Sequence, residues 1–156
     1  MPSQSKPIDW RRAQPLPAAL AKYLKANFLQ ISETGIYNDR NIAGTQKKSA
    51  HAEGRALDIH LRVNHPDEKL IADRLYRIFI EADHETGIDN VIWNRRIWSR
   101  ARGEHAYVGV SPHTDHIHVE FTRPGSQLTV WHLLALKVAQ LRTGLEELSH
   151  AQANIG

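Results

Sequence analysis

The sequence predicts an α+β fold, in which a small and mainly antiparallel sheet is flanked by helices. Two short stretches, 56–63 and 116–121, alternate apolar and polar residues with the period of two of a half-buried strand. Three longer stretches, 16–30, 66–86 and 126–148, repeat apolar residues every three or four positions, as amphipathic helices do. A chain of 156 residues is long enough for one domain with a hydrophobic core of its own.

The first part of the chain predicts an arm, a helix and a strand. Residues 1–15 are polar and carry three prolines. The helix over 16–30 follows from apolar residues that fall close to one face, namely Leu16, Leu20, Tyr23, Leu24 and Phe28. After turns at Gly35 and the YNDR stretch, residues 56–63 predict a strand with two distinct faces. Its apolar face carries Leu57, Ile59, Leu61 and Val63, and its polar face carries Ala56, Asp58, His60 and Arg62.

The middle of the chain predicts a long helix and three strands. Pro66 suits a first helical turn and Gly87 can end the helix, so that we expect it to span 66–86. The stretches that then predict strands are 90–98, 105–110 and 116–121.

A last helix is expected from Ser126 to about Leu148. Its apolar residues step by three and four positions, as in a coiled-coil seam: Trp131, Leu134, Val138, Leu141, Leu145 and Leu148. We expect this helix to pack on its own domain, with a homodimer contact as the alternative. The predicted organisation is an N-terminal arm (1–15), one domain (16–125) and a C-terminal helix (126–156).

The composition restricts the kinds of metal site and partner. There is no cysteine, so disulfides and thiolate metal sites are excluded, and any metal must be held by His, Asp or Glu. Ten histidines are many for this length. A net charge of +3 and a pI near 9.3 suit an anionic polymer, although an ordinary soluble surface explains them more simply. No apolar run approaches the length of a membrane span, and the polar N-terminus lacks the apolar core of a signal peptide.

Side chains that can bind a metal gather in two stretches, SAHAEGRALDIHL and HTDHIHVEF. His116 and His118 lie two residues apart in a predicted strand and therefore share a face. Asp58 lies on the polar face of another strand, and His51 precedes it across a glycine-containing turn. Three ligands from two elements, with one position left for water, is how catalytic zinc sites are built. The two stretches together predict a metal site with imidazole and carboxylate ligands.

The first stretch resembles the Ser-x-His-x-x-Gly-x-Ala-x-Asp signature of the M15 peptidases. They belong to a wider group of zinc peptidoglycan peptidases with the LAS, or hedgehog-like, fold, which includes D-Ala-D-Ala carboxypeptidases, phage L-alanyl-D-glutamate endopeptidases and penicillin-insensitive murein endopeptidases. DHIH resembles the His-x-His that closes the zinc site of this group. GIYNDRNIAGTQKKSAHAEGRALDI also resembles the extensin-like C-terminal domain, without the cysteines usual there. The resemblance runs from about Tyr37 to Phe121, and the residues on the signature are Ser49, His51, Gly54, Ala56 and Asp58.

The resemblance implies roles for individual residues. It makes His51, Asp58 and His118 the zinc ligands, because the second histidine of His-x-His binds the metal in this group. It also makes Arg40, in YNDR, the arginine that polarises the carbonyl of the scissile bond.

The general base stays open between two family patterns. Some members place an acid three residues before the last ligand, where this chain has Asp115. Others use a His-x-x-His-x-His arrangement, which His113, His116 and His118 reproduce. We favour Asp115 with His116 assisting, although the period of two places Asp115 off the histidine face.

Other residues of the two stretches have simpler expected roles. We expect Ser49 to cap a turn or support a ligand and not to be a nucleophile, and Gly54 to be required by the backbone. His60 is expected to form part of the wall of the site. Glu120 shares a face with His118 and can orient it through a hydrogen bond.

The function implied by the resemblance is that of a zinc-dependent endopeptidase or carboxypeptidase. Its expected substrates are the stem or cross-link peptides of bacterial peptidoglycan, whose anionic character fits the basic charge loosely. Without a signal peptide, we expect synthesis in the cytoplasm and access to the cell wall through phage lysis, as for an endolysin, or through secretion as an effector. A third route is that the domain is part of a larger protein.

Two alternative functions come from other classes. A catalytically inactive module would keep the metal and bind cell wall or a protein partner, but the intact Asp115 and His116 argue against it. A nucleic-acid binder needs clustered basic and aromatic residues, which occur only in WNRRIWSRAR at 93–102. We therefore expect no nucleic-acid partner and no membrane insertion.

Overall fold

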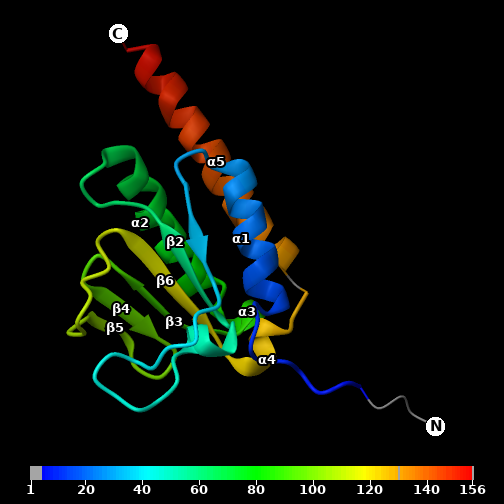
Figure 1. The fold of residues 1–156 in the computed structure, drawn as a ribbon. Helices are drawn as coiled ribbons and strands as arrows, with labels where there is room; N and C mark the ends of the chain where they lie inside the picture. The colour runs from blue at the N-terminus through cyan, green and yellow to red at the C-terminus, as the bar shows by residue number, and fades with distance from the viewer. Residues whose placement is uncertain (1–4, 130, 156) are drawn as a thin grey trace.

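The computed structural model describes residues 5–129 and 131–155 and has the α+β fold that the sequence predicts (Figure 1). Six strands form one sheet in the order β1-β2-β6-β3-β4-β5, and all neighbouring strands are antiparallel. The strands are β1 (Thr34–Gly35), β2 (Ala56–His60), β3 (Ile88–Trp93), β4 (Arg96–Ser99), β5 (Gly103–Ala106) and β6 (His116–Phe121). The helices are α1 (Pro15–Asn27), the 3-10 helix η1 (Ala50–Glu53), α2 (Pro66–Glu81), α3 (Asp83–Thr86), α4 (Arg123–Ser126) and α5 (Trp131–Ala153).

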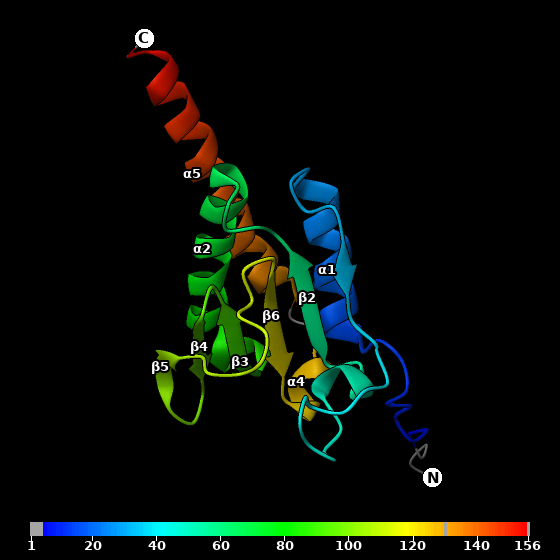
Figure 2. The same ribbon diagram turned by 60° about the vertical axis from the view of Figure 1, so that its left-hand side comes forward.

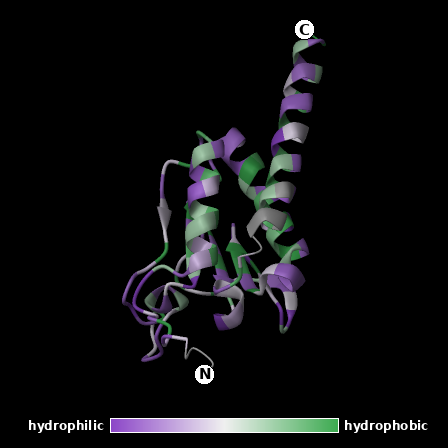
Figure 3. Ribbon diagram, turned by 90° about the vertical axis from the view of Figure 1, so that its right-hand side faces the viewer, coloured by the Kyte–Doolittle hydropathy of each residue, from purple (hydrophilic) through white to green (hydrophobic). Residues whose placement is uncertain are grey.

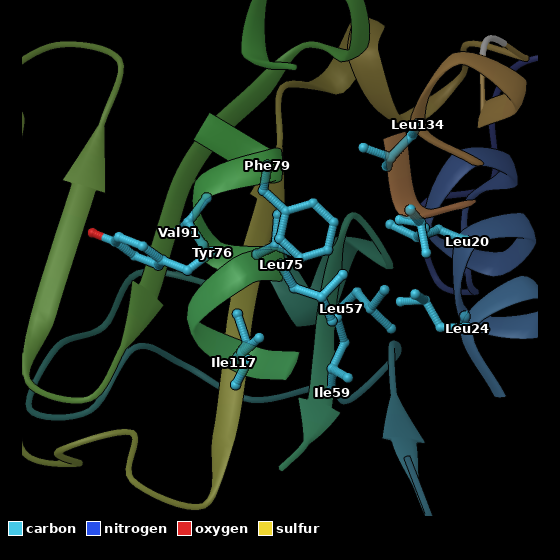
Figure 4. Packing of buried hydrophobic residues seen from close by; sticks show 14 of the residues in the cluster. Leu20, Leu24, Leu57, Ile59, Leu75, Tyr76, Phe79, Val91, Ile117 and Leu134 are labelled. Carbon is cyan, nitrogen blue, oxygen red and sulfur yellow. The ribbon is translucent and has the colours of Figure 1, made fainter. Parts of the chain in front are cut away.

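One face of the sheet carries the hydrophobic core. Figures 1 and 2 show α1, α2 and α5 on the same side of the sheet. The core residues of these helices and of β2 and β6 pack against one another (Figure 4). They include Leu20, Leu24, Leu57, Ile59, Leu75, Phe79, Ile117 and Leu134. On β2 and β6 the apolar residues face this core, as their alternation predicts, and the polar residues between them face the opposite side.

The predicted helix over 66–86 is divided into two pieces. Pro66 is at its first turn, as predicted, and α2 ends at Glu81. Ala82, with a ψ of 5°, separates α2 from the short α3. Gly87 ends α3 with a φ of 66°, and an added Cβ there would lie 2.6 Å from the backbone of Gly125, so that only glycine fits.

The predicted strand over 90–98 is wrong, because the chain turns back within it. Asn94 and Arg95 have φ values of 47° and 66° and connect β3 to β4 as a two-residue hairpin turn. Neither residue is a glycine, so the usual sequence signal for such a turn is missing. The following strand, β5, covers Gly103–Ala106 instead of 105–110.

The C-terminal helix begins later than predicted and extends past the sheet. Ser126 is the buried last residue of α4, which Thr122 caps by accepting a hydrogen bond from Gly125 N. The apolar seam of α5 is buried in its first half, at Leu134, Val138 and Leu141, so this half packs on the domain as expected; the side chain of Trp131 lies outside what the structure describes. Beyond it, α5 projects away from the body of the molecule (Figure 1). Within the described ranges, no helix is long and apolar enough to cross a membrane.

Candidate metal centre

Strand pairing brings Asp58 and His118 together on the open face of the sheet. β2 and β6 are neighbours, and Asp58 lies directly opposite His118 in their register. The next pair on the same face is His60 opposite His116. Facing residues of an antiparallel pair have Cβ atoms about 4.5–5.5 Å apart, so their side chains are in reach of each other.

The third potential ligand, His51, is held by the turn before β2. Ser49 caps η1 by accepting a hydrogen bond from Ala52 N, which confirms its predicted role as a cap. His51 Nδ1 donates to the Ile36 carbonyl at 2.6 Å, and this contact directs Nε2 toward the sheet. Only 3% of His51 is exposed, so its ring is enclosed on nearly all sides.

Gly54 allows this turn to form beside the N-terminal arm. Its φ is 64°, and an added Cβ would lie 1.7 Å from the carbonyl oxygen of Arg12. Gln14 N donates to the Gly54 carbonyl at 2.9 Å, and the Gln14 side chain is itself buried. The backbone role expected for Gly54 is confirmed, but the arm that lies against it was not anticipated as a support for the site.

The three potential ligand atoms lie close together. Asp58 Oδ1 is 2.9 Å from His118 Nδ1 and 3.1 Å from His51 Nε2, and the two nitrogens are 3.2 Å apart. Ligand atoms of a tetrahedral zinc site, each about 2.0–2.1 Å from the ion, are about 3.3–3.4 Å apart, so the group fits a small divalent ion with slight expansion. His51, Asp58 and His118, which the sequence singled out, thus form a buried group that could hold a metal ion.

A carboxylate and an amide behind the site orient His118. Its Nε2 donates to Glu120 Oε1 at 3.0 Å, and Asn90 Nδ2 donates to Glu120 Oε2 at 2.9 Å. The interaction with Glu120 keeps the proton on Nε2 and leaves Nδ1 for the metal position. The expected contact between Glu120 and His118 is present. Asn90 was missed, because its part depends on the pairing of β3 with β6, which no local pattern reveals.

The metal-free site keeps both carboxylates ionised. Burial raises the pKa of Asp58, but hydrogen bonds with His118 and His51 outweigh it, and the pKa ends below its ordinary value. For Glu120, burial is likewise outweighed by the hydrogen bond with His118, and the pKa falls to about 2. Burial lowers the pKa of His118, but its contacts with Asp58 and Glu120 raise it to about 9. The site therefore holds two ionised carboxylates on either side of the His118 ring, an arrangement that favours a bound cation.

Asp115 and His116 form a pair at the edge of the site. His116 Nδ1 is 2.7 Å from Asp115 Oδ1, and His116 Nε2 is 3.9 Å from Asp58 Oδ1. The His116 side chain is 17% exposed, whereas that of Asp115 is 72% exposed. Asp115 therefore lies off the histidine face, as the period of two indicates, and reaches the site through His116.

His113 lies deeper, in the loop before β6. Its ring is 4.6 Å from that of His116 and 5.8 Å from that of His118, and Tyr107 packs edge-on against it at 5.0 Å. Its Nδ1 donates to the Ser111 carbonyl at 2.8 Å. Burial first, and then the neighbouring His116, lowers the pKa of His113 to about 4, so that the ring is neutral.

Arg40 is near the site by its backbone alone. Its carbonyl accepts a hydrogen bond from Ser49 N at 3.1 Å, in a loop that is also tied to the His51 carbonyl through Asn38 N. The Arg40 side chain is exposed. Among the described residues its guanidinium has no hydrogen-bond or ion-pair partner, so the structure does not bring it to the metal ligands.

The fold and the site together define an α+β domain with a buried His-Asp-His group that could hold a metal ion. The family model of the VldE C-terminal domain matches residues 10–118. This is more than half of the chain, which therefore belongs to the VldE C-terminal domain family. The match starts in the arm that supports Gly54, includes all three potential ligands and ends before α4 and α5. Neither the curated proteins nor the solved structures contain a significant match to the chain.

Proposed function

We propose that this protein is a zinc-dependent peptidase that cleaves the stem or cross-link peptides of bacterial peptidoglycan. The observation that carries the proposal is the close approach of His51 Nε2, Asp58 Oδ1 and His118 Nδ1, with His116 at the edge of the same site. The resemblance of both ligand stretches to zinc peptidoglycan peptidases supports the choice of reaction and substrate. Two imidazoles and one carboxylate favour zinc over harder cations such as calcium or magnesium.

The ligands and the reacting side chains have separate tasks. His51, Asp58 and His118 would hold the ion, and the bond between Glu120 and His118 would keep the ligand nitrogen available. A bound zinc ion would lower the pKa of its bound water to about 7 and would polarise the carbonyl of the scissile bond.

His116 is the better placed of the two candidate bases. Asp115 occupies its Nδ1, so that Nε2 is the nitrogen directed toward Asp58. His116 Nε2 would take the proton of the attacking water and return it to the leaving amine. Asp115 would orient the ring and stabilise its charged form, as the carboxylate does in other His-Asp pairs. This reverses the weighting that the sequence favoured, in which Asp115 was the base.

His113 and Arg40 differ in what they can offer to a substrate. Since Nδ1 of the neutral His113 ring donates to Ser111, its Nε2 has a lone pair and can only accept a hydrogen bond, for example from a substrate amide. It is therefore unsuited to stabilise an oxyanion. Arg40 is a suitable donor by chemistry, and the proposal keeps for it the role that the resemblance implies, although its side chain is exposed in this structure.

Delivery to the cell wall follows the routes considered for the sequence. The proposal assigns the protein to the cell wall or periplasm, reached as an endolysin or as a secreted effector. Release of the protein into a culture medium only after host lysis would support the first route.

The test is mass spectrometry of purified muropeptides after incubation with the protein. We expect products that carry a new amine, loss of cleavage with a chelator, and recovery when zinc is added back. Asp58→Ala should be inactive, and His105→Ala, which alters a histidine of β5 that contacts the Gly103 carbonyl, should remain active. A zinc-loaded protein that releases no new amine from any muropeptide would contradict the proposal and favour an inactive binding module.

A further inference from the structure

The part of the chain outside the family match ends in a helix whose outer half has few contacts. Leu134, Val138 and Leu141 of α5 are buried, but Leu148 is 46% exposed although it continues the same seam. Figure 1 shows this half of α5 projecting beyond the other helices, and Figure 3 shows polar and apolar residues alternating along it. The seam is thus longer than the domain that covers it.

A groove follows α5 on the side of α2. One hollow, of about 310 Å³, lies between the two helices and contains Arg74 and Arg77 of α2 and Lys137 of α5, with Glu81 as its one carboxylate. A second hollow, of about 420 Å³, is lined along α5 by small residues and ends at Glu147. The two hollows share Gln140 and therefore adjoin on α5, although only the first also includes residues of α2; together we call them the α5 groove.

The two ends of the α5 groove carry opposite charges. Three cations face one carboxylate at the Lys137 end, whereas Glu147 is the charged residue of the other end. In the described part of the chain, neither Lys137 nor Glu147 takes part in an ion pair. The two residues are ten positions apart, which is about 15 Å along a helix. A surface with opposite charges at its ends is complementary to a copy of itself that runs in the reverse direction.

From this arrangement we infer that the occupant of the α5 groove is α5 of a second copy of this chain, in an antiparallel two-fold dimer. Lys137 and Glu147 are each five positions from Arg142, so a two-fold axis at that level pairs each Lys137 with Glu147 of the other copy. The same pairing sets Gly144 level with Gln140 of the other copy. Both charge pairs form at once, because the interface uses the same surface from each copy.

Small residues at the centre of the groove allow the helices to approach. The lining includes Ala139, Thr143 and Gly144, and an added Cβ on Gly144 would meet only Arg74 Nη1 at 3.8 Å. Helices with small residues at their contact pack at the short end of the usual distance of about 8–10 Å. Two crossing helices bury less surface than a stable dimer needs, so we expect dissociation constants on the order of micromolar to tens of micromolar.

Charge reversal with rescue tests this pairing by sedimentation velocity from low micromolar to near-millimolar concentration. The wild-type chain is expected to shift from monomer to dimer. Lys137→Glu and Glu147→Lys should each raise the dimer dissociation constant at least about tenfold, because each places like charges together twice. The variant with both substitutions should regain the dimer.

The matched control is Glu104→Lys. Glu104 is an exposed carboxylate on β5, the edge strand of the sheet, where it pairs with Arg96 at 3.7 Å, and it lines neither hollow. We expect this variant to dimerise as the wild type does. A wild-type chain that stays monomeric overturns the inference and leaves the groove to a helix of another protein. Failure of the double variant to recover overturns it as well. The zinc affinity of all variants should be unchanged, so the outcome is independent of the proposed peptidase activity.

Discussion

The side chains on the two faces of β2 are held by different interactions, apolar packing on one face and polar contacts on the other. Leu57 and Ile59 are fully buried among the apolar residues of α1 and α2. Asp58, between them, points to the opposite face, where it forms a hydrogen bond with His118 and lies 3.1 Å from His51 Nε2. Because alternate residues of one strand supply both faces, the packed core fixes the backbone from which the ligand projects. Substitutions of adjacent residues should therefore separate stability from metal binding.

A similar contrast exists within the site itself. The three potential ligands are enclosed, with side-chain exposures of 3% for His51, 18% for Asp58 and 9% for His118. Asp115 and Arg40, which the sequence assigned to catalysis, are exposed. The fold thus holds the three potential ligands close together, whereas Asp115 and Arg40 extend into solvent.

The largest effect is expected for Asp58→Asn, which removes a ligand charge and keeps the shape of the side chain. Zinc affinity should fall by more than about 100-fold, because loss of a hydrogen bond to a metal ligand alone can cost that much and here the ligand itself is altered. Cleavage should stop. The metal-free protein should keep its fold but lose some thermal stability, because the ionised Asp58 stabilises the charged form of His118, as the lowered pKa of Asp58 and the raised pKa of His118 indicate. Isothermal titration with zinc and thermal unfolding measure the two quantities. A zinc affinity equal to that of the wild type would show that Asp58 is not a ligand.

His116→Ala should separate metal binding from turnover. We expect zinc content to stay near one per chain and the rate to fall by about 10²–10⁴, the usual contribution of a positioned general base. Asp115→Asn should have a smaller effect, since it removes the partner of the ring and not the ring itself. If Asp115→Asn is the more damaging of the two changes, the carboxylate is the base, as the sequence first suggested.

Ile59→Ala makes the opposite change on the other face of β2. Replacement of a fully buried isoleucine should lower the free energy of unfolding by about 2–5 kcal/mol. Zinc affinity should remain within a few-fold of the wild type at temperatures where the variant is folded. Urea unfolding of the metal-free protein gives the first quantity, and a large loss of zinc affinity in the folded variant would contradict the separation of the two faces.

The face of each strand residue could be predicted from sequence, but its neighbours could not. Alternation over 116–121 identified His116 and His118 as sharing a polar face, and the structure has β6 at the same bounds. That Asp58 lies opposite His118, and Asn90 opposite Glu120, depends on strand order and register, which are set by the packing of the whole sheet. The set of potential metal ligands was therefore accessible through motif resemblance, whereas the support from Asn90 was not.

Turns account for the remaining differences between prediction and structure. Ser49 and Gly54 carry local signals, and the structure confirms both the cap and the left-handed glycine. The hairpin at Asn94 and Arg95 has no such signal, because two non-glycine residues adopt positive φ there. Arg95 N donates to the Pro112 carbonyl and Asn94 N to the His113 carbonyl, so contacts with a distant loop stabilise the turn. Tertiary contacts of this kind cannot be read from a local pattern.

Glu120→Gln tests the support behind the site with a smaller change. The amide keeps the size of the side chain but accepts the proton of His118 Nε2 less strongly, so zinc affinity should fall by about 10–100-fold. Nitrogen chemical shifts of His118 would show which ring atom keeps its proton, which a purely structural role would not alter.

The smallest expected effect is the pH dependence of zinc binding. The zinc affinity should change about tenfold for each pH unit. In the metal-free protein the pKa of His118 is raised to about 9, so below that pH zinc must displace a proton from the ring. Affinity should therefore rise with pH and level off near pH 9, and calorimetry in buffers of different ionisation enthalpy should detect the released proton at pH 7.5. Because Glu120 helps to raise this pKa, Glu120→Gln should move the levelling point to lower pH. An affinity that is flat from pH 7 to 9 would mean that His118 is already neutral in the metal-free protein, and that the charge of Glu120 does not act on the metal site through this ring.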